Sequence, residues 1–251
     1  MSRKTESHPN VFISIIIPAF NEEHRIGKTL EGYLKRFGGD SEVIVVLNGC
    51  QDNTLKVVEG FQDIYPKNLK WLNIPERIGK GWAIIEGLKI ARGKLVGYVD
   101  ADGSTSPEDF QMLIDQIQNH DGVIASRFIP GAEAERSFIR IFFGKCFFFI
   151  TKLLFWLPFR DTQCGAKIFR SQVILHVLPH LTSKDMVFDV DLLYHVVKKG
   201  FKIIEVPTIW VEQRHSAVFS SHFKLLRMSL IMLFSLIKLR IRTFLDNSGS
   251  G

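Results

Sequence analysis

The sequence predicts an α/β fold, a doubly wound and mostly parallel sheet with helices on both faces. Three observations lead to this prediction: apolar runs of strand length, amphipathic segments of helical spacing between them, and polar clusters that follow the apolar runs. Continuous apolar strands are buried on both sides, as in parallel sheets covered by helices. Of the 251 residues, 46% are hydrophobic and 23% are charged, so the chain can bury a sizeable core.

The first half of the chain alternates regularly between strands and helices. Its strands are apolar and rich in β-branched residues, and its helices repeat apolar residues at helical spacing. The sequence Ser106-Pro-Glu is typical of the start of a helix. In chain order the predicted elements are strand 12–17, helix 25–36, strand 42–47, helix 53–61, strand 69–74, helix 81–91, strand 94–99, helix 106–119 and strand 122–126.

Beyond Arg127 this alternation breaks down. The sequence predicts one or two aromatic-rich helices over 137–157 and a long helix over 222–242 with an apolar body and a basic rim. Helices of this composition lie in a membrane interface or pack under a sheet, and the sequence leaves both possibilities open for 137–159. The other predicted elements are strand 167–169, helix 187–198 and strands 201–206 and 209–211; we expect residues 11–215 to form the main domain.

Charge is distributed unevenly along the chain. Residues 1–135 hold 15 basic and 19 acidic side chains, a balance of −4, whereas residues 136–251 hold 17 and 7, a balance of +10. A basic second half predicts an anionic partner. Because its phenylalanines lie in long apolar runs instead of spaced stacking platforms, a membrane surface is favoured and nucleic acid is ranked last.

The apolar segments do not predict a membrane span or a signal peptide. Lys145 and Lys152 interrupt the most apolar stretch, 141–159, and the first ten residues are polar. Three cysteines show no disulfide framework and no metal-ligand spacing, which favours a reducing compartment. We therefore expect a peripheral or monotopic protein on the cytoplasmic side of a membrane.

Four polar clusters follow strands or lie beside them, where open α/β sheets bind ligands. Asp100 and Asp102 come directly after an apolar strand, and two such carboxylates can converge on Mg²⁺ or Mn²⁺, which often bridge to substrate phosphates. The loop before the third helix pairs glycines with basic residues, as phosphate-binding loops do. The clusters are Pro18–Glu23, Asn48–Asn53, Arg77–Gly81 and Asp100–Ser104.

These motifs together resemble the family-2 glycosyltransferases of the GT-A fold. The resemblance rests in the first half on PAFNEE, the Asp-Asn-Thr after the second strand, the Arg-x-Gly-Lys-Gly loop and Asp-Ala-Asp. The second half is similar to the dolichyl-phosphate glucosyltransferase branch, whose near relatives are the dolichyl-phosphate mannose synthases. The pieces that carry this are Ser126-Arg127, the Arg136–Arg140 segment, RDTQCG at 160–165 and FDVDL at 188–192; the resemblance covers roughly 11–240.

The resemblance implies a role for individual residues. Arginines at 127 and 140 receive the phosphate of a lipid acceptor, and Arg136 joins them because a guanidinium matches phosphate geometry. Metal binding falls to Asp100 and Asp102, and a catalytic or orienting role falls to Asp102, Asp161, Gln163 and Arg127. The donor would be held by Pro18, Phe20, Asn21, Glu22, Asn48, Asp52, Lys80, Asp100 and Arg214.

The sequence departs from the family pattern at three places. The second loop reads Leu47-Asn48-Gly-Cys where the family has Asp-Asp-Gly-Ser, so Asn48 replaces a carboxylate that would contact the base. Ala166 stands where the family has Phe. Ser216-Ala217 replaces a Ser-Lys pair, which leaves Arg214 as the late phosphate contact.

The expected reaction is inverting transfer of a hexose, glucose from UDP-glucose first, to dolichyl or another polyprenyl phosphate. An acceptor phosphate is already ionised at neutral pH, so it needs cations instead of a strong general base. Whether Asp189 or Asp191 takes part in catalysis stays open. The alternatives are GDP-mannose as donor, a soluble or protein acceptor, and a non-catalytic nucleotide-binding module.

Overall fold

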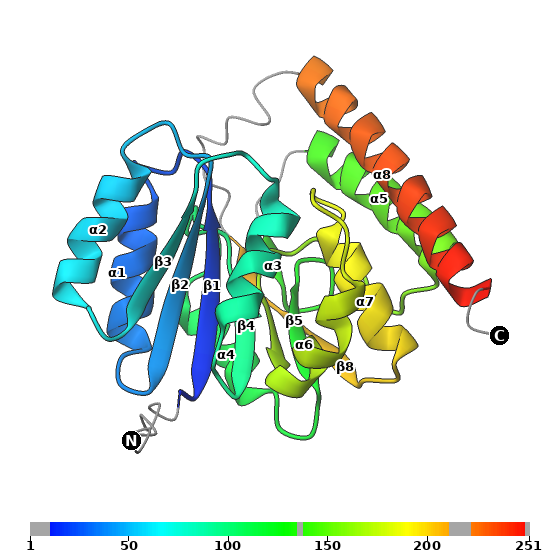
Figure 1. Cartoon of the computed structure of the whole chain (residues 1–251). Coiled ribbons are helices and arrows are strands. Elements are labelled where there is room, and N and C mark those ends of the chain that lie inside the picture. The colour runs from blue at the N-terminus through cyan, green and yellow to red at the C-terminus, as the bar shows by residue number, and fades with distance from the viewer. Residues whose placement is uncertain (1–10, 135–137, 211–221, 249–251) are drawn as a thin grey trace, which may run out of the picture.

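The computed structural model describes residues 11–134, 138–210 and 222–248. A seven-stranded sheet with the order β3-β2-β1-β4-β7-β5-β8 forms the centre of the molecule (Figure 1). Every neighbouring pair is parallel except those of β7, which runs antiparallel to both β4 and β5. The prediction of a mostly parallel α/β sheet is confirmed.

The first half contains the predicted alternation of strands and helices. Each predicted strand lies within two residues of its observed bounds, and the fourth helix ends earlier than predicted, at Asp115. The elements are β1 (Ile13–Ala19), α1 (Ile26–Arg36), β2 (Ser41–Asn48), α2 (Thr54–Ile64), β3 (Leu69–Ile74), α3 (Lys80–Ile90), β4 (Leu95–Tyr98), α4 (Pro107–Asp115) and β5 (Gly122–Ser126).

The second half is more irregular, as expected. The aromatic segment is one helix, and the last helix is longer than its predicted bounds. A short helix after β7 was not predicted, since its seven residues are too few for a clear periodicity. The elements are β6 (Glu133–Ala134), α5 (Phe138–Phe155), β7 (Lys167–Arg170), α6 (Ser171–Val177), η1 (Leu178–His180), α7 (Phe188–Lys198), β8 (Ile203–Pro207), β9 (Ile209–Trp210) and α8 (His222–Ser248).

Two hydrophobic cores cover the two faces of the sheet. Along β1, Ile15 and Ile17 belong to one core, whereas Ile16 belongs to the other, because successive strand side chains point to opposite faces. The first core takes residues from α1, α2 and α4. The second takes residues from α3, α6 and α7, and also Leu236 and Leu239 of α8. The last helix therefore packs on the main domain.

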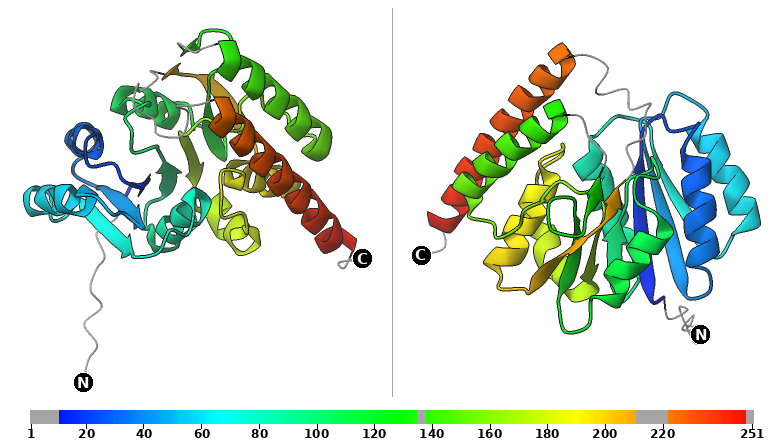
Figure 2. Two further views of the ribbon diagram at one scale, coloured as in Figure 1. Left: turned by 90° about the horizontal axis from the view of Figure 1, so that it is seen from above. Right: turned by 180° about the vertical axis from the view of Figure 1, so that it is seen from behind.

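Helices α5 and α8 lie side by side at one end of the molecule in all three views (Figures 1 and 2). Among the α8 side chains that the structure describes, Leu236, Leu239 and Thr243 are buried, while Phe234 and Phe244 are 69% and 63% exposed. In α5, Leu153 is 74% exposed. In the described ranges, no helix is both long and apolar enough to cross a bilayer.

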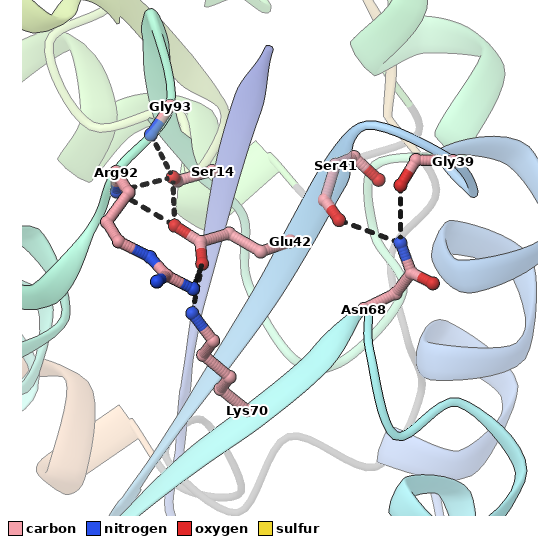
Figure 3. Close-up of polar contacts among 8 residues, drawn as sticks. All are labelled: Ser14, Gly39, Ser41, Glu42, Asn68, Lys70, Arg92 and Gly93. Carbon is pink, nitrogen blue, oxygen red and sulfur yellow. Dashed lines mark hydrogen bonds and ion pairs between the residues drawn. The ribbon is translucent and has the colours of Figure 1, made fainter. Parts of the chain in front are cut away.

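A buried carboxylate connects the amino ends of the parallel strands (Figure 3). Glu42 is 1% exposed; it accepts hydrogen bonds from the Ser14 hydroxyl (2.6 Å), the Lys70 ammonium (2.6 Å) and the Arg92 backbone N–H (2.8 Å). The Ser14 hydroxyl also accepts a hydrogen bond from the Gly93 backbone N–H (2.7 Å). These contacts join β1, β2, β3 and the segment that enters β4.

Candidate active site

The candidate site lies at the opposite edge of the sheet, where β1, β2 and β4 end. The parallel pairing of β1 with β2 and with β4 brings the segments after these strands to one edge. The loop that precedes α3 reaches the same edge, since Gly49 N–H donates to Ile74 O at the end of β3. Three of the four predicted clusters therefore follow neighbouring parallel strands, and the fourth lies beside them.

Side chains predicted to bind the donor also hold the first two loops together. Asp52 accepts hydrogen bonds from the Glu23 backbone N–H (3.1 Å) and, through its other oxygen, from the Thr54 N–H (3.0 Å). Asn21, at a φ of 54°, accepts one from the Gln51 N–H (2.8 Å). Asn21 and Asp52 thus help to fix the conformation of the two loops. The sequence had predicted both residues only as contacts to the nucleotide.

The second loop is tied to the loop before α3. Asn48 is 4% exposed, and its side-chain oxygen accepts a hydrogen bond from the Ile78 backbone N–H (2.7 Å). The Arg77 guanidinium lies 4.1 Å from the centre of the Phe20 ring, within the range of a cation–π contact. The Asn48 side-chain oxygen therefore already has a hydrogen-bond donor within the protein. The Phe20 ring packs against the Arg77 guanidinium.

Lys80 and Asp100 form an ion pair at the centre of this edge. The Lys80 Nζ is 2.5 Å from the Asp100 Oδ1, and both side chains are partly exposed. Burial acts to raise the pKa of Asp100, but Lys80, with Lys167 and Arg127, outweighs it and holds that pKa below its usual range. Asp100 therefore stays ionised, and Lys80 stays charged.

Asp102 keeps acceptor capacity beside this pair. In the described part of the chain its side chain makes one hydrogen bond, from the Ser104 N–H to Oδ1 (3.0 Å). Burial raises the pKa of Glu22 against the lowering effect of Arg25, and the nearby charges of Asp102 and Asp100 raise it further. Three carboxylates thus share one electrostatic environment.

This donor set fits a divalent cation held jointly with a bound ligand. Carboxylate oxygens suit Mg²⁺ and Mn²⁺. Over the residues that the structure describes, no three His, Cys, Asp or Glu side chains come together as a complete metal cage. Asp102 and Asp100 would therefore supply part of the coordination, and substrate phosphates and water the rest.

A second ion pair lies after β5. Arg127 meets Asp161 with two parallel hydrogen bonds, Nε to Oδ2 (2.7 Å) and Nη2 to Oδ1 (3.0 Å). Asp161 is 2% exposed, and Glu205 in β8 accepts hydrogen bonds from its backbone N–H (2.9 Å) and from that of Arg160 (3.0 and 2.9 Å). Burial tends to raise the pKa of Asp161, but Arg127 lowers it. Asp161 is thus placed to orient Arg127.

Gln163 follows Asp161 in the same loop. Its backbone N–H donates to Asp161 Oδ1 (3.1 Å). Its side-chain nitrogen is buried and has no hydrogen-bond partner among the described residues. A buried amide donor without an acceptor is costly unless a ligand or solvent supplies one. The place of Gln163 at the reacting sugar stays a prediction.

Sequence reasoning missed a buried charge cluster beneath the site. Lys167 in β7 is fully buried; its Nζ donates to Asp189 Oδ1 (2.5 Å) and to Cys164 O (2.6 Å). The Tyr98 hydroxyl donates to the same Asp189 oxygen (2.5 Å). The available signal was one lysine in an apolar strand and two aspartates, Asp189 and Asp191, in the first turn of a mostly apolar helix. The Oδ1 atom of Asp189 therefore accepts hydrogen bonds from two groups of the protein.

The structure does not describe the side chains of three predicted arginines. Arg136 and Arg214 lie outside the described residues. Arg140 belongs to the first turn of α5, but its side chain is not among those described. Pro18 is half-buried in β1, directly before the first loop.

Residues 14–178 match the family model described as glycosyl transferase family 2. Among curated proteins, the chain is 31% identical over 220 residues to a dolichyl-phosphate beta-glucosyltransferase of Dictyostelium discoideum, covering 81% of this chain and 67% of that protein. It is 29% identical to the dolichyl-phosphate beta-glucosyltransferase of Saccharomyces cerevisiae, covering 80% and 67%. The chain thus spans about two thirds of the length of these relatives.

The fold is similar to that of a solved enzyme. Glucosyl-3-phosphoglycerate synthase from Mycobacterium tuberculosis, in complex with uridine diphosphate, aligns with a TM-score of 0.70 at 16% identity over 91% of this chain and 80% of that one. Another structure of that synthase holds Mn²⁺, uridine diphosphate and glucosyl-3-phosphoglycerate, and aligns with a TM-score of 0.67. At this identity the likeness establishes the fold alone.

Proposed function

Because the chain belongs to the family-2 glycosyltransferases, we propose that it transfers glucose from UDP-glucose to dolichyl or another polyprenyl phosphate, with inversion. One observation carries this proposal: the Lys80 Nζ lies 2.5 Å from Asp100 Oδ1, and the loop that holds Asp161, the partner of Arg127, packs on the same carboxylate, since a Cβ added at Gly165 would overlap Asp100 Oδ2. The predicted donor cation and the ion pair of the predicted acceptor cation are therefore both connected to Asp100 at this edge of the sheet. A reaction between a diphosphate donor and an anionic acceptor needs such an arrangement.

The donor half would bind a nucleotide diphosphate. Lys80 would contact the diphosphate, while Asp102 and Asp100 would hold Mg²⁺ or Mn²⁺. When bound, the cation supplies charge neutralisation to the departing diphosphate. Phe20, Asn21, Glu22, Asn48, Asp52 and Pro18 would form the nucleoside side of the site, with Arg214 as a late phosphate contact.

The acceptor half would supply positive charge. Arg127 is oriented by a two-pronged contact with Asp161, so its guanidinium is fixed before an acceptor arrives. Arg136 and Arg140 would add contacts to the lipid phosphate. The phosphate oxygen is ionised at neutral pH and attacks the anomeric carbon without losing a proton to the protein.

The helix pair α5 and α8 would hold the enzyme at a membrane surface, on the cytoplasmic side. Its outer faces expose large apolar side chains, and exposed Lys145, Lys152, Lys238 and Arg242 lie among them. An apolar face with a cationic rim is complementary to an anionic bilayer surface. The apolar side chains in question are Phe149, Leu153, Phe234, Ile237, Ile241, Phe244 and Leu245, with Trp156 directly after α5.

Two alternatives make different predictions in one assay. Membranes that contain the protein are incubated separately with labelled UDP-glucose and GDP-mannose, and lipid-linked sugar is extracted. We expect label from UDP-glucose in the lipid fraction. If only GDP-mannose labels the lipid fraction, the proposed donor is wrong and GDP-mannose takes its place. If label appears only in soluble or protein products, the proposed lipid acceptor is wrong. Sedimentation with anionic vesicles tests the membrane surface directly.

Arg140→Ala tests the acceptor half. A charge-assisted contact to phosphate contributes about 1.5–3 kcal/mol, so kcat/KM for polyprenyl phosphate should fall roughly ten- to a hundredfold. Arg140→Lys should recover only part, because an ammonium lacks the planar fork. Donor affinity, measured by calorimetry, should barely change. Weaker donor binding with intact acceptor kinetics would place Arg140 in the other half of the site.

A further inference from the structure

A hydrogen bond joins α8 to the segment that precedes α7. The Ser235 hydroxyl donates to Asp185 Oδ2 (2.5 Å). Asp185 lies in residues 181–187, which we name the bracing loop. On α8, the neighbouring Leu236 is fully buried and Leu239 nearly so, in the core beneath α3 and α7. This part of α8 is therefore fixed to the main domain, although its outer face is exposed.

The bracing loop is also held from α7. Asp185 uses its other carboxylate oxygen to accept a hydrogen bond from the Val187 N–H (2.9 Å). The Asp191 carboxylate accepts hydrogen bonds from the N–H groups of Thr182 and Ser183 (2.9 Å each). Hydrogen bonds to Asp191 thus hold the first part of the loop, and the hydrogen bond between Asp185 and Val187 holds its last part. Ser235 adds a hydrogen bond from a different helix, α8.

The bracing loop packs against the first turn of α3, which contains Lys80. The Trp82 N–H, one of the first amides of α3 and without a partner in its own helix, donates to Lys184 O (3.3 Å). At Gly79, whose φ is 94°, an added Cβ would overlap that same carbonyl. At Gly81, an added Cβ would lie 2.7 and 2.9 Å from two other carbonyl oxygens of the loop. Lys80 is therefore flanked by two residues in direct contact with the loop.

We propose that Ser235 and Asp185 are positioning residues for Lys80. The chain of contacts runs from α8 through the bracing loop to the first turn of α3, and from Lys80 to Asp100. Through these contacts, the helix that would rest on the lipid surface holds the lysine that would bind the donor diphosphate. The inference rests on the proposed function for the ligand of Lys80, but the mechanical link is a property of the fold.

Hydrogen exchange tests the link without any ligand. Ser235→Ala removes the hydroxyl, and we expect backbone amides of residues 79–83 to exchange about threefold to tenfold faster. Thr243→Ala is the matched control, because among the described residues the Thr243 hydroxyl donates to Arg240 O, within α8 itself (3.0 Å). Ser235→Thr keeps a hydroxyl and should restore slow exchange. Unchanged exchange in Ser235→Ala would overturn the inference.

A donor titration tests the consequence for Lys80. Ser235→Ala and Asp185→Ala should each weaken UDP-glucose binding about threefold to tenfold, while Thr243→Ala should not. In a Lys80→Ala background, Ser235→Ala should cause no further loss, since coupled residues are not additive. An equal loss in both backgrounds would show a general structural effect and overturn the positioning role. Wild-type protein that binds no UDP-glucose, with the exchange difference intact, would overturn the proposed donor alone.

Discussion

The two edges of the sheet each hold a carboxylate that pairs with a lysine. At the amino edge, Lys70 lies 2.6 Å from Glu42, and at the carboxyl edge Lys80 lies 2.5 Å from Asp100. The surroundings differ. Glu42 is 1% exposed and is bonded by groups from β1, β3 and the segment before β4. Asp100 and the neighbouring Asp102 are both partly exposed.

This difference separates a carboxylate that the protein itself satisfies from one that can still accept a ligand. A fully satisfied buried carboxylate stabilises the strands that it joins, and it has no capacity left for a ligand. Asp102 has only one hydrogen bond within the described residues, so its remaining oxygen lone pairs can accept a cation. We therefore expect the same residue types to serve stability at one edge and, under the proposed function, chemistry at the other.

The largest expected effect is at Asp102. Asp102→Ala removes the carboxylate best placed for a metal, and we expect turnover to fall by about a thousandfold or more, because charge neutralisation contributes several kcal/mol. Thermal stability should change little, since the side chain makes one hydrogen bond to its own loop. The measurement is sugar transfer with and without EDTA, alongside thermal unfolding. Activity within tenfold of wild type, or full wild-type activity in EDTA, would remove the metal role.

The two lysines provide the most direct comparison. Lys80→Ala should weaken UDP-glucose binding about tenfold to a hundredfold, because a charge-assisted phosphate contact is lost. Lys70→Ala should leave donor affinity unchanged and lower the free energy of unfolding by about 1 kcal/mol, since Lys70 is partly exposed. Calorimetric titration and urea unfolding of both variants measure this. Equal effects of both variants on donor affinity would show that the two edges do not differ in function.

A smaller effect than those of Asp102→Ala and Lys80→Ala is expected from the pH dependence of stability at Glu42. Burial would raise its pKa, but hydrogen bonds from Lys70, Ser14 and Arg92 lower it below the ordinary value of 4.5. A lowered folded-state pKa means that the charged form contributes stability above about pH 4.5, and that this is lost as pH falls through the folded-state value.

Glu42→Gln tests this sign. The variant should be less stable than wild type by about 1–2 kcal/mol at pH 7, and the difference should shrink below pH 4.5. Urea unfolding at a series of pH values measures it, and the activity of the folded variant at pH 7 should match wild type. A difference that grows in acid would mean that Glu42 is protonated in the folded protein.

Much of the fold and of the donor side could be predicted from sequence. Apolar periodicity predicted the strands and most helices, and the position of polar residues after them predicted the edge that holds Lys80, Asp100 and Asp102. The antiparallel direction of β7 could not be predicted, because a strand of four residues carries no directional signal. Nor could Lys167, whose partner Asp189 lies 22 positions further along the chain.

The sequence by itself determined the fold class, the family and the loops that carry the chemistry, because these depend on local patterns of apolar and polar residues. The tertiary structure decided which carboxylates accept hydrogen bonds from the protein itself and which remain able to bind a ligand. Asp52 and Asp161 are bonded by the protein, whereas Asp102 retains acceptor capacity within the described chain. It also decided that Ser235 meets Asp185, 50 positions away. Such contacts depend on how helices pack across a sheet, and packing brings together residues whose spacing in the chain carries no signal.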